Sequence, residues 1–386
     1  MWGRAVGRMR VVGFAEGVRR ANLGMPSPPK SDDPHSTLRA SLSQRERDIK
    51  TRMNYVIRPL RIDDLDALGR FLTSGLGAAP GADFAAPAVL RWKFLDPTAA
   101  DSQPRSWGAV DGSGAIVGHV GIVLTAFESA AIPGDGRVGA LHMIDWLGSP
   151  AHRGVGASLM RRAHEAAPVQ FGLGGSSAGR SVIKGGGYRP MPPAFLHRRL
   201  LRPLRWFRRS GGTSPGQLAR LARELVRKRS RRPVVTLELQ RVESFGSEID
   251  SVSTQAREAM VLTTRSADRL NAFLRFPRQA PSGFLIRDER GDVRGFALLN
   301  LIANPDGGPV VGKIVDCLLD GYDFEYWHAA FVLLSDELAR QGADVADAAP
   351  AFAEHGLEGV EPVGIGEMRR HADHGDRLVG RGAWRR

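Results

Sequence analysis

Cysteine is nearly absent from this chain of 386 residues, because Cys317 is its single example. One cysteine excludes an intramolecular disulfide and a zinc site built on cysteines, so a reducing cytoplasm is the compartment that fits best. Apolar runs near the roughly 18 residues that a membrane-spanning helix needs are also missing. With 42% hydrophobic and 25% charged residues, the composition predicts a soluble globular protein, and the length predicts two domains.

Residues 1–52 lack sustained apolar periodicity and are rich in Arg, Gly, Pro and Ser. This composition predicts a disordered N-terminal extension. A transit peptide is the alternative, and the acids Glu46 and Asp48 argue against it. The folded part is expected to begin at Met53, before an apolar alternation and an Asp-rich helix start. Met53 also offers an alternative start of translation.

Acidic residues are scarce in a connector, which we define as residues 197–232. The net charge of the chain is +13, and residues 198–232 hold thirteen Arg or Lys but one acid. Leu218, Leu221 and Leu225 recur at helical spacing, which predicts a basic amphipathic helix. The connector is interpreted as a solvated linker, a contact for an anionic membrane surface or phosphorylated substrate, or a nucleic-acid contact. Because the rest of the chain is nearly neutral, a broad nucleic-acid-binding face is not expected.

Three pairs of segments repeat in the same order in the two halves of the chain. They are RWKFLDP (91–97) with LNAFLRFP (270–277), DGSGAIVGHVG (111–121) with DERGDVRGFAL (288–298), and HMIDWL (142–147) with KIVDCL (313–318). Three matches in register indicate duplication of one fold. The repeated unit is well over a hundred residues long, so the sequence predicts a pair of domains and not a solenoid.

Each unit predicts the same series of elements. A helical segment is followed by a hairpin with a tight Asp-Gly or Arg-Gly turn, a strand with a central Asp, a helix and a short final strand. The helices are expected at 156–167 and at about 324–341. Antiparallel strands that lead into a strand-helix-strand unit predict an α/β fold with a mixed sheet and helices packed on it.

The stretch SPAHRGVGASLM (149–160) lies between the strand LHMIDWL and the first of these helices. The backbone N–H groups of such a turn face outward at a helix N-terminus, which is a natural site for an anion. Gly154 and Gly156 permit a close approach to a phosphate, and Arg153 adds a positive charge.

This turn and the order of elements, with KGGGY (184–188) downstream, resemble the GNAT superfamily of N-acetyltransferases. In that family an Arg/Gln-x-x-Gly-x-Gly/Ala turn binds the pyrophosphate of acetyl-CoA. The resemblance therefore implies acetyl-CoA as cosubstrate and direct attack of an amine on its thioester. Two registers remain open: the family's first Arg/Gln falls on Ala151, or the loop after Arg153 is two residues short.

The resemblance implies a set of cofactor-binding residues. They are Leu147, Arg153, Gly154, Val155, Gly156, Ala157, Ser158 and Ser176, with the N–H groups from Arg153 to Ser158 as phosphate donors. Ser176 is a contact for the pantetheine arm or, alternatively, a helix cap.

Three residues are candidates for the acid–base chemistry that the resemblance implies. His142 and Asp145 titrate on the strand beside the acetyl group, and strand alternation places them on opposite faces. Because Asp145 recurs as Asp316, a structural anchor is as good an interpretation as a general base. The family's usual tyrosine acid would fall on Ile183, so Tyr188, at the aromatic position, is the remaining acid candidate.

The second unit has acids where the phosphate turn should be, among them Asp320, Asp323 and Glu325, which predicts a domain that has lost the cofactor. Trp327 and Phe331 are expected in its core or interface.

The predicted parts of the chain are therefore an extension (1–52), an acyl-CoA-binding domain (53–196), the connector (197–232), a degenerate second domain (233–366) and a tail (367–386).

Two hypotheses of function follow. The first is an N-acetyltransferase whose acceptor is a small amine or an amino sugar. The second is a catalytically inactive paired module that binds a partner or an anionic surface through the connector. No metal is expected in either.

Overall fold

The first sheet has six strands, and its main path runs in the order β1-β2-β3-β4-β5. The computed structural model describes residues 54–96, 104–172, 179, 188, 195–211, 214–226, 232–304, 306–348 and 361–364. The predicted extension 1–52, the tail 367–386 and Ser176 lie outside the described residues. Across the described part of the chain, no helix is both long and apolar enough to cross a membrane.

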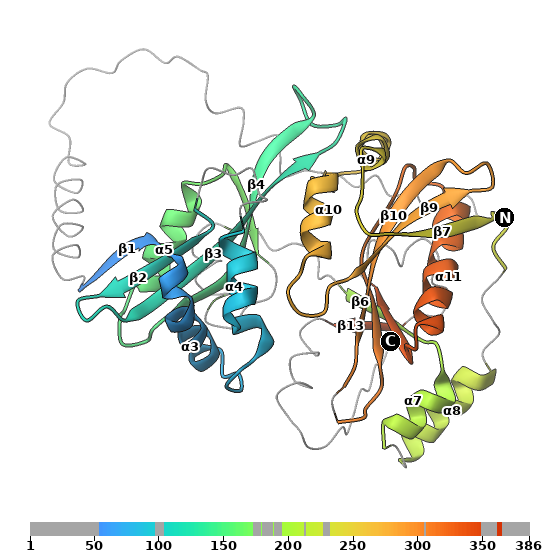
Figure 1. Ribbon diagram of the computed structural model, residues 1–386, viewed down its shortest axis with the longest axis horizontal. Coiled ribbons are helices and arrows are strands. Elements are labelled where there is room, and N and C mark those ends of the chain that lie inside the picture. Colours follow the sequence, from blue (N-terminus) through green and yellow to red (C-terminus); the bar gives the residue numbers. More distant parts are fainter. Residues whose placement is uncertain are drawn as a thin grey trace, which may run out of the picture. The chain divides into compact units, whose positions relative to one another are not determined.

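The strands of the first sheet follow the predicted series. They are β1 (Tyr55–Pro59), β2 (Ser106–Asp111), β3 (Ile116–Glu128), β4 (Arg137–Gly148) and β5 (Val169–Gly172). Neighbours from β1 to β4 are antiparallel, and β5 is parallel to β4 after the helix α5 (Val155–His164). The helices α3 (Leu65–Gly75) and α4 (Pro87–Phe94) lie between β1 and β2 in the chain (Figure 1). The predicted mixed α/β fold, with the expected order of elements, is confirmed.

The second sheet repeats this order with seven strands, arranged β13-β6-β12-β11-β10-β9-β7. Its strands are β6 (Phe195–Leu200), β7 (Leu237–Val242), β9 (Ser282–Asp288), β10 (Val293–Ile302), β11 (Val311–Leu319), β12 (Val345–Ala348) and β13 (Glu361–Gly364). Its helices include α9 (Glu248–Ala259), α10 (Ala267–Leu274) and α11 (Phe324–Arg340). As α5 does in the first sheet, α11 joins a strand to its parallel neighbour.

The two hairpin turns have the same internal bonding. The Asp111 carboxylate accepts the N–H groups of Ser113 and Ala115, and Gly114 has φ +86°. In the second sheet the Asp288 carboxylate accepts two N–H groups at the same spacing, and Gly291 has φ +85°. A left-handed backbone at the fourth position favours glycine, so both turns need the Asp-x-x-Gly pattern.

Two strands pair with the sheet of the other half. β6 follows the first unit in the chain but pairs with β12 and β13 in the second sheet. The short strand β8 (Leu262–Thr263) from the second half pairs with β3 in the first sheet. The boundary expected at residue 196 therefore falls inside a strand of the second sheet.

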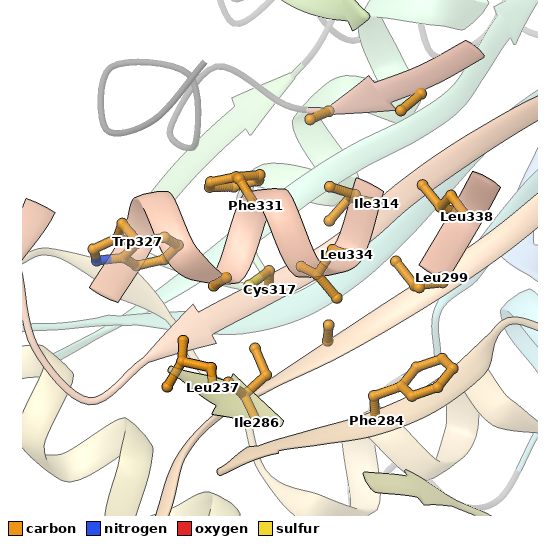
Figure 2. Close-up of a cluster of buried hydrophobic side chains, with 14 of the residues drawn as sticks. Leu237, Phe284, Ile286, Leu299, Ile314, Cys317, Trp327, Phe331, Leu334 and Leu338 are labelled. Carbon is orange, nitrogen blue, oxygen red and sulfur yellow. The ribbon is translucent and has the colours of Figure 1, made fainter. Parts of the chain in front are cut away.

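Buried apolar side chains lie on both faces of each sheet. One face of the first sheet packs Leu141 and Met143 against α5, and the other packs Ile144 and Leu147 against α3 and α4. In the second sheet α11 supplies the largest cluster, which Figure 2 shows. Trp327 and Phe331, two of its members, are 3% and 0% exposed. These two residues thus belong to the core, one of the two places expected for them.

The connector is tied to the second sheet by buried carboxylates. Arg198 of β6 forms a bidentate pair with Asp347 at 2.7 Å. Arg205 and Arg209 of α7 (Pro203–Arg209) form ion pairs with Asp344, which is fully buried. The predicted basic amphipathic helix is present as α8 (Pro215–Val226). Part of the positive charge of the connector therefore balances buried acids and is not available to a partner.

Replacing Asp344 with Asn tests this anchoring. The substitution leaves two arginines, 39% and 32% exposed, without their acid. The free energy of unfolding is therefore expected to fall by about 1.5–3 kcal/mol, the range for lost hydrogen bonds to a charged group. Chemical denaturation measures the change. Arg340→Ala is the control: its side chain is 75% exposed in a pair with Glu337, and its loss should cost less than about 1 kcal/mol. Equal losses for the two variants would contradict the anchoring.

Candidate functional site

The turn between β4 and α5 begins its helix without a side-chain cap. Gly154 is the N-cap residue, has φ +85° and offers no side-chain acceptor to the helix. A β-carbon at this φ would cost about 1 kcal/mol or more, which explains the glycine. The turn closes through two backbone bonds, from His152 N–H to Ser149 O at 3.0 Å and from Val155 N–H to His152 O at 3.2 Å.

Several N–H groups at this helix start remain open to a ligand. Among the described residues, no hydrogen-bond partner is present for the N–H groups of Arg153, Gly154, Gly156 and Ala157. Two of the expected donors are used internally, because Val155 and Ser158 donate to backbone carbonyls of the turn. These two N–H groups are bonded within the turn, and the open ones keep the character of an anion site. Phosphate binding by the N–H groups from about Arg153 to Ser158 stays a prediction.

The start of α5 is held against β4 by close contacts. The indole Nε1 of Trp146 donates to Gly156 O at 2.9 Å. A β-carbon on Gly148 would lie 3.1 Å from Gly156 N and 2.9 Å from a methyl group of Val155. The absence of a side chain at Gly148 thus permits the helix to begin directly over the end of the strand.

The corresponding helix start in the second unit is closed by its own side chain. Asp323 is the N-cap of α11, and its carboxylate accepts the N–H groups of Glu325 at 2.8 Å and Tyr326 at 3.4 Å. Asp320, just before it, pairs with Arg294. A carboxylate therefore occupies the place where an external anion would bind.

β4 contains a β-bulge at Asp145. On either side of the bulge, Ile144 pairs with Gly121 and Leu147 pairs with His119. Between these two pairs, β4 has one more residue than β3. Asp145 has φ +47°, and it is the one non-glycine residue with positive φ in the described part of the chain. A bulge shifts the alternation of side chains.

The expectation that His142 and Asp145 lie on opposite faces is wrong. His142 pairs with Val123, which lies two residues from Gly121 on the face packed by α4. Asp145 is on the same face, because its carboxylate contacts Lys93 of α4 at 2.8 Å. The extra residue of the bulge is the physical reason, because the prediction used an unbroken strand period of two.

The two repeated aspartates share a bonding pattern. Asp145 pairs with Lys93, and Asp316 pairs with Arg265 at 2.9 Å. Each basic residue lies on or just before a helix of the matched segments, α4 or α10. β11 also carries an extra residue directly before Asp316. The arrangement favours an anchoring role for Asp145, and its role as a general base remains a prediction.

His142 is the titratable candidate with a neutral ring at neutral pH. It is partly buried and stacks on Phe171 of β5, with ring centroids 4.7 Å apart. Burial and, second, the charge of Arg269 lower the pKa of His142 below its ordinary value. A neutral imidazole can accept a proton from an ammonium group.

Tyr188 lies at the opposite end of α5 from the turn. Its hydroxyl donates to Gln170 Oε1 at 2.6 Å and lies 3.0 Å from Nε2 of His164, the last residue of the helix. Burial raises the pKa of Tyr188. At about 1.5 Å per residue, the ends of α5 are about 13 Å apart, so the structure does not bring this hydroxyl to the candidate phosphate site.

One edge of β4 has no strand partner near its end in the described part of the chain. β4 and β5 pair from Ala140 to Met143, and among the described residues no strand pairs with Ile144–Gly148 on that side. Leu147 lies in this interval but packs toward α3, where its side chain fills the space that a β-carbon on Gly75 would need. The bulge, the open edge and the start of α5 are therefore consecutive along the chain.

A buried histidine beneath the bulge was not singled out in the sequence. His119 is 0% exposed, and its Nδ1 lies 2.8 Å from the Asp145 carbonyl oxygen. Its Nε2 lies 2.9 Å from Oγ of Ser106. Since a carbonyl oxygen only accepts, Nδ1 carries the proton and the Ser106 hydroxyl donates to Nε2. The signal in the sequence was a histidine at the place where the second unit has Phe296.

Comparisons with known proteins found similar structures but no similar sequences. No protein-family model and no curated protein matches the chain. Saccharomyces cerevisiae N-myristoyltransferase with bound myristoyl-CoA is similar at 10% identity and TM-score 0.49, over 80% of this chain and 81% of that one. A probable N-acyltransferase from Enterococcus faecalis V583 is similar at 12% identity and TM-score 0.48, over 76% and 65% of the two chains. Eis1 from Mycobacterium abscessus has 14% identity and TM-score 0.44, over 80% and 71%.

The buried His119 predicts a loss of stability in acid. Burial lowers its pKa from 6.5 to about 4, so below pH 6.5 the unfolded chain takes up a proton that the folded protein refuses. The free energy of unfolding should therefore fall as the pH falls from 6.5 to 4, by about 3 kcal/mol from this group. Denaturation of wild type and His119→Phe across this range isolates the contribution. Parallel pH profiles for the two proteins would contradict it.

Proposed function

We propose that the protein is an N-acyltransferase that uses acetyl-CoA and a primary amine, with its active site in the first unit. The observation that carries this proposal is the uncapped start of α5, with N–H groups that lack a partner among the described residues. Open backbone donors and a helix dipole suit the linked phosphates of a coenzyme. The side chain of Arg153 is exposed beside them and adds positive charge.

The reaction follows from the order of groups along β4. With the pyrophosphate at the start of α5, the pantetheine arm runs along the open edge of Ile144–Gly148 and brings the thioester to the bulge. The nitrogen of the acceptor attacks the thioester carbonyl, forms an amide bond and expels the CoA thiolate. His142, neutral because burial lowers its pKa, takes the proton that the ammonium group must lose.

The other two candidates have different tasks in this proposal. Asp145 stays in its ion pair with Lys93 and holds the bulge against α4. The Tyr188 hydroxyl donates to Gln170 at the far end of α5, so in this proposal it is not assigned a proton transfer. The thiolate then leaves without an acid from these three side chains. A small amine or an amino sugar remains the proposed acceptor.

Calorimetric titration with acetyl-CoA tests the proposal directly. Binding followed by release of free CoA thiol in the presence of amines is the expected result. A panel that spans small amines, amino sugars and peptide N-termini would identify the acceptor class. Absence of binding by the intact protein would overturn the enzyme and favour a non-catalytic module.

A carboxylate at the helix start should abolish coenzyme binding. Gly156→Asp adds a negative charge beside the open N–H groups, where a β-carbon would meet only ordinary contacts with Trp146 at 3.5 Å. The affinity for CoA is expected to fall at least about 10-fold, since charge repulsion in this partly desolvated place exceeds about 1.4 kcal/mol. Calorimetry measures the change.

Two control variants separate the effect of the added charge from the effect of the added side-chain volume and from a general effect on folding. Gly156→Asn has nearly the same shape without the charge and should retain most of the affinity. Asp323→Ala opens the capped helix of the second unit and should leave CoA affinity unchanged. Equal losses for Gly156→Asp and Gly156→Asn would contradict an electrostatic site.

Loss of His142 should remove the general base. His142→Gln is expected to lower kcat by about 100-fold or more with little change in CoA affinity. In wild type the acid limb of kcat/KM should lie below pH 6.5, because the lowered pKa keeps the ring neutral to a lower pH. This limb should disappear in the variant. A variant that keeps both the limb and the rate would exclude His142 as the base.

A further inference from the structure

The duplicated fold provides an internal comparison for the buried network under the bulge. Aligned without gaps, His119 corresponds to Phe296 and the neighbouring Ser106 corresponds to Gly283. Both His119 and Phe296 are 0% exposed and make an edge contact with a phenylalanine ring. The same position in the fold therefore accepts an apolar ring, and the folding of the sheet does not require a histidine there.

Burying His119 in the first unit has a desolvation cost that burying Phe296 in the second unit does not have. Burial of an imidazole and a hydroxyl is unfavourable unless every polar atom is bonded. Here each ring nitrogen has a partner, Ser106 on one side and the Asp145 carbonyl on the other. The polar network lies in the unit whose helix start is open, and the apolar pair lies in the unit whose helix start is capped by Asp323.

The bond to Asp145 acts on a strained part of the backbone. Asp145 has φ +47° within the bulge, a conformation that costs a non-glycine residue about 1 kcal/mol or more and persists when neighbours fix it. Lys93 holds its side chain, and His119 holds its carbonyl oxygen. In a trans peptide the carbonyl and the next N–H point in opposite directions. A carbonyl turned to His119 therefore turns the N–H of Trp146 away from the imidazole.

We propose that His119 is a positioning residue that fixes the Asp145–Trp146 peptide of the bulge so that its N–H faces the thioester carbonyl of the bound substrate. This role rests on the proposed function, because it needs a thioester at the open edge of β4. In the transition state negative charge develops on the thioester oxygen, and a preoriented backbone N–H stabilises it. No covalent change occurs at His119, whose ring remains neutral.

Three variants test the role. His119→Phe copies the second unit and is expected to fold, to keep its affinity for CoA within about 3-fold and to lose about 10- to 100-fold in kcat. His119→Asn retains an N–H that can reach toward the Asp145 carbonyl and should recover part of kcat. Ser106→Ala removes only the bond to Nε2 and should cost less than His119→Phe.

A second measurement reports on the peptide itself. A CoA analogue with a ketone in place of the thioester is added to the isotope-labelled protein, and the amide resonance of Trp146 is followed. We expect a downfield shift in wild type, from the new hydrogen bond, and little shift in His119→Phe despite equal binding. This readout distinguishes positioning from a merely structural role.

The outcomes separate the two proposals. The positioning role is overturned if His119→Phe retains the wild-type kcat. It is also overturned if the variant loses CoA affinity and stability at neutral pH in proportion to its loss of kcat. Neither result contradicts the proposed enzyme activity. If the wild-type protein binds no CoA and transfers no acyl group, the proposed function is overturned and this role with it.

Discussion

The N–H groups at the start of α5 are the constraint on which the candidate site depends. A helix leaves its first N–H groups without internal partners, and they must bond to a side chain, to water or to a ligand. Most protein helices solve this with a capping side chain. Here the N-cap is Gly154, whose left-handed backbone supplies no acceptor, and the close contact of α5 with Gly148 places the open groups at the end of β4.

In the second unit a single side chain occupies the N–H groups at the corresponding helix start. α11 packs on its sheet as α5 does, and its core of large apolar side chains is the larger of the two helix-side clusters. Yet one carboxylate, Asp323, accepts hydrogen bonds from the first N–H groups of its own helix. Burial of apolar surface sets the fold in both units, whereas one or two polar residues decide whether the helix start can take an anion.

Charge in this protein is arranged more locally than its net value suggests. The basic connector supplies Arg198 and Arg209 to carboxylates that are 2% exposed or less. In each sheet a cation pairs with the aspartate at the bulge: Lys93 of α4 in the first, and Arg265, just before α10, in the second. Buried acids of this kind need close partners, because isolated charges are strongly disfavoured away from water.

The sequence by itself determined the mixed α/β fold, the places of the two hairpin turns and the turn at Gly154, because apolar period and glycine position are local properties. Tertiary structure alone decided the face of Asp145, the position of Tyr188 at the far end of α5 and the place of β6 in the second sheet. Each of these depends on contacts between residues far apart in the chain: a bulge set by pairing with β3, a hydroxyl bonded to Gln170, and a strand bonded to β12. Periodicity carries no information about such partners, which form only when the chain is packed.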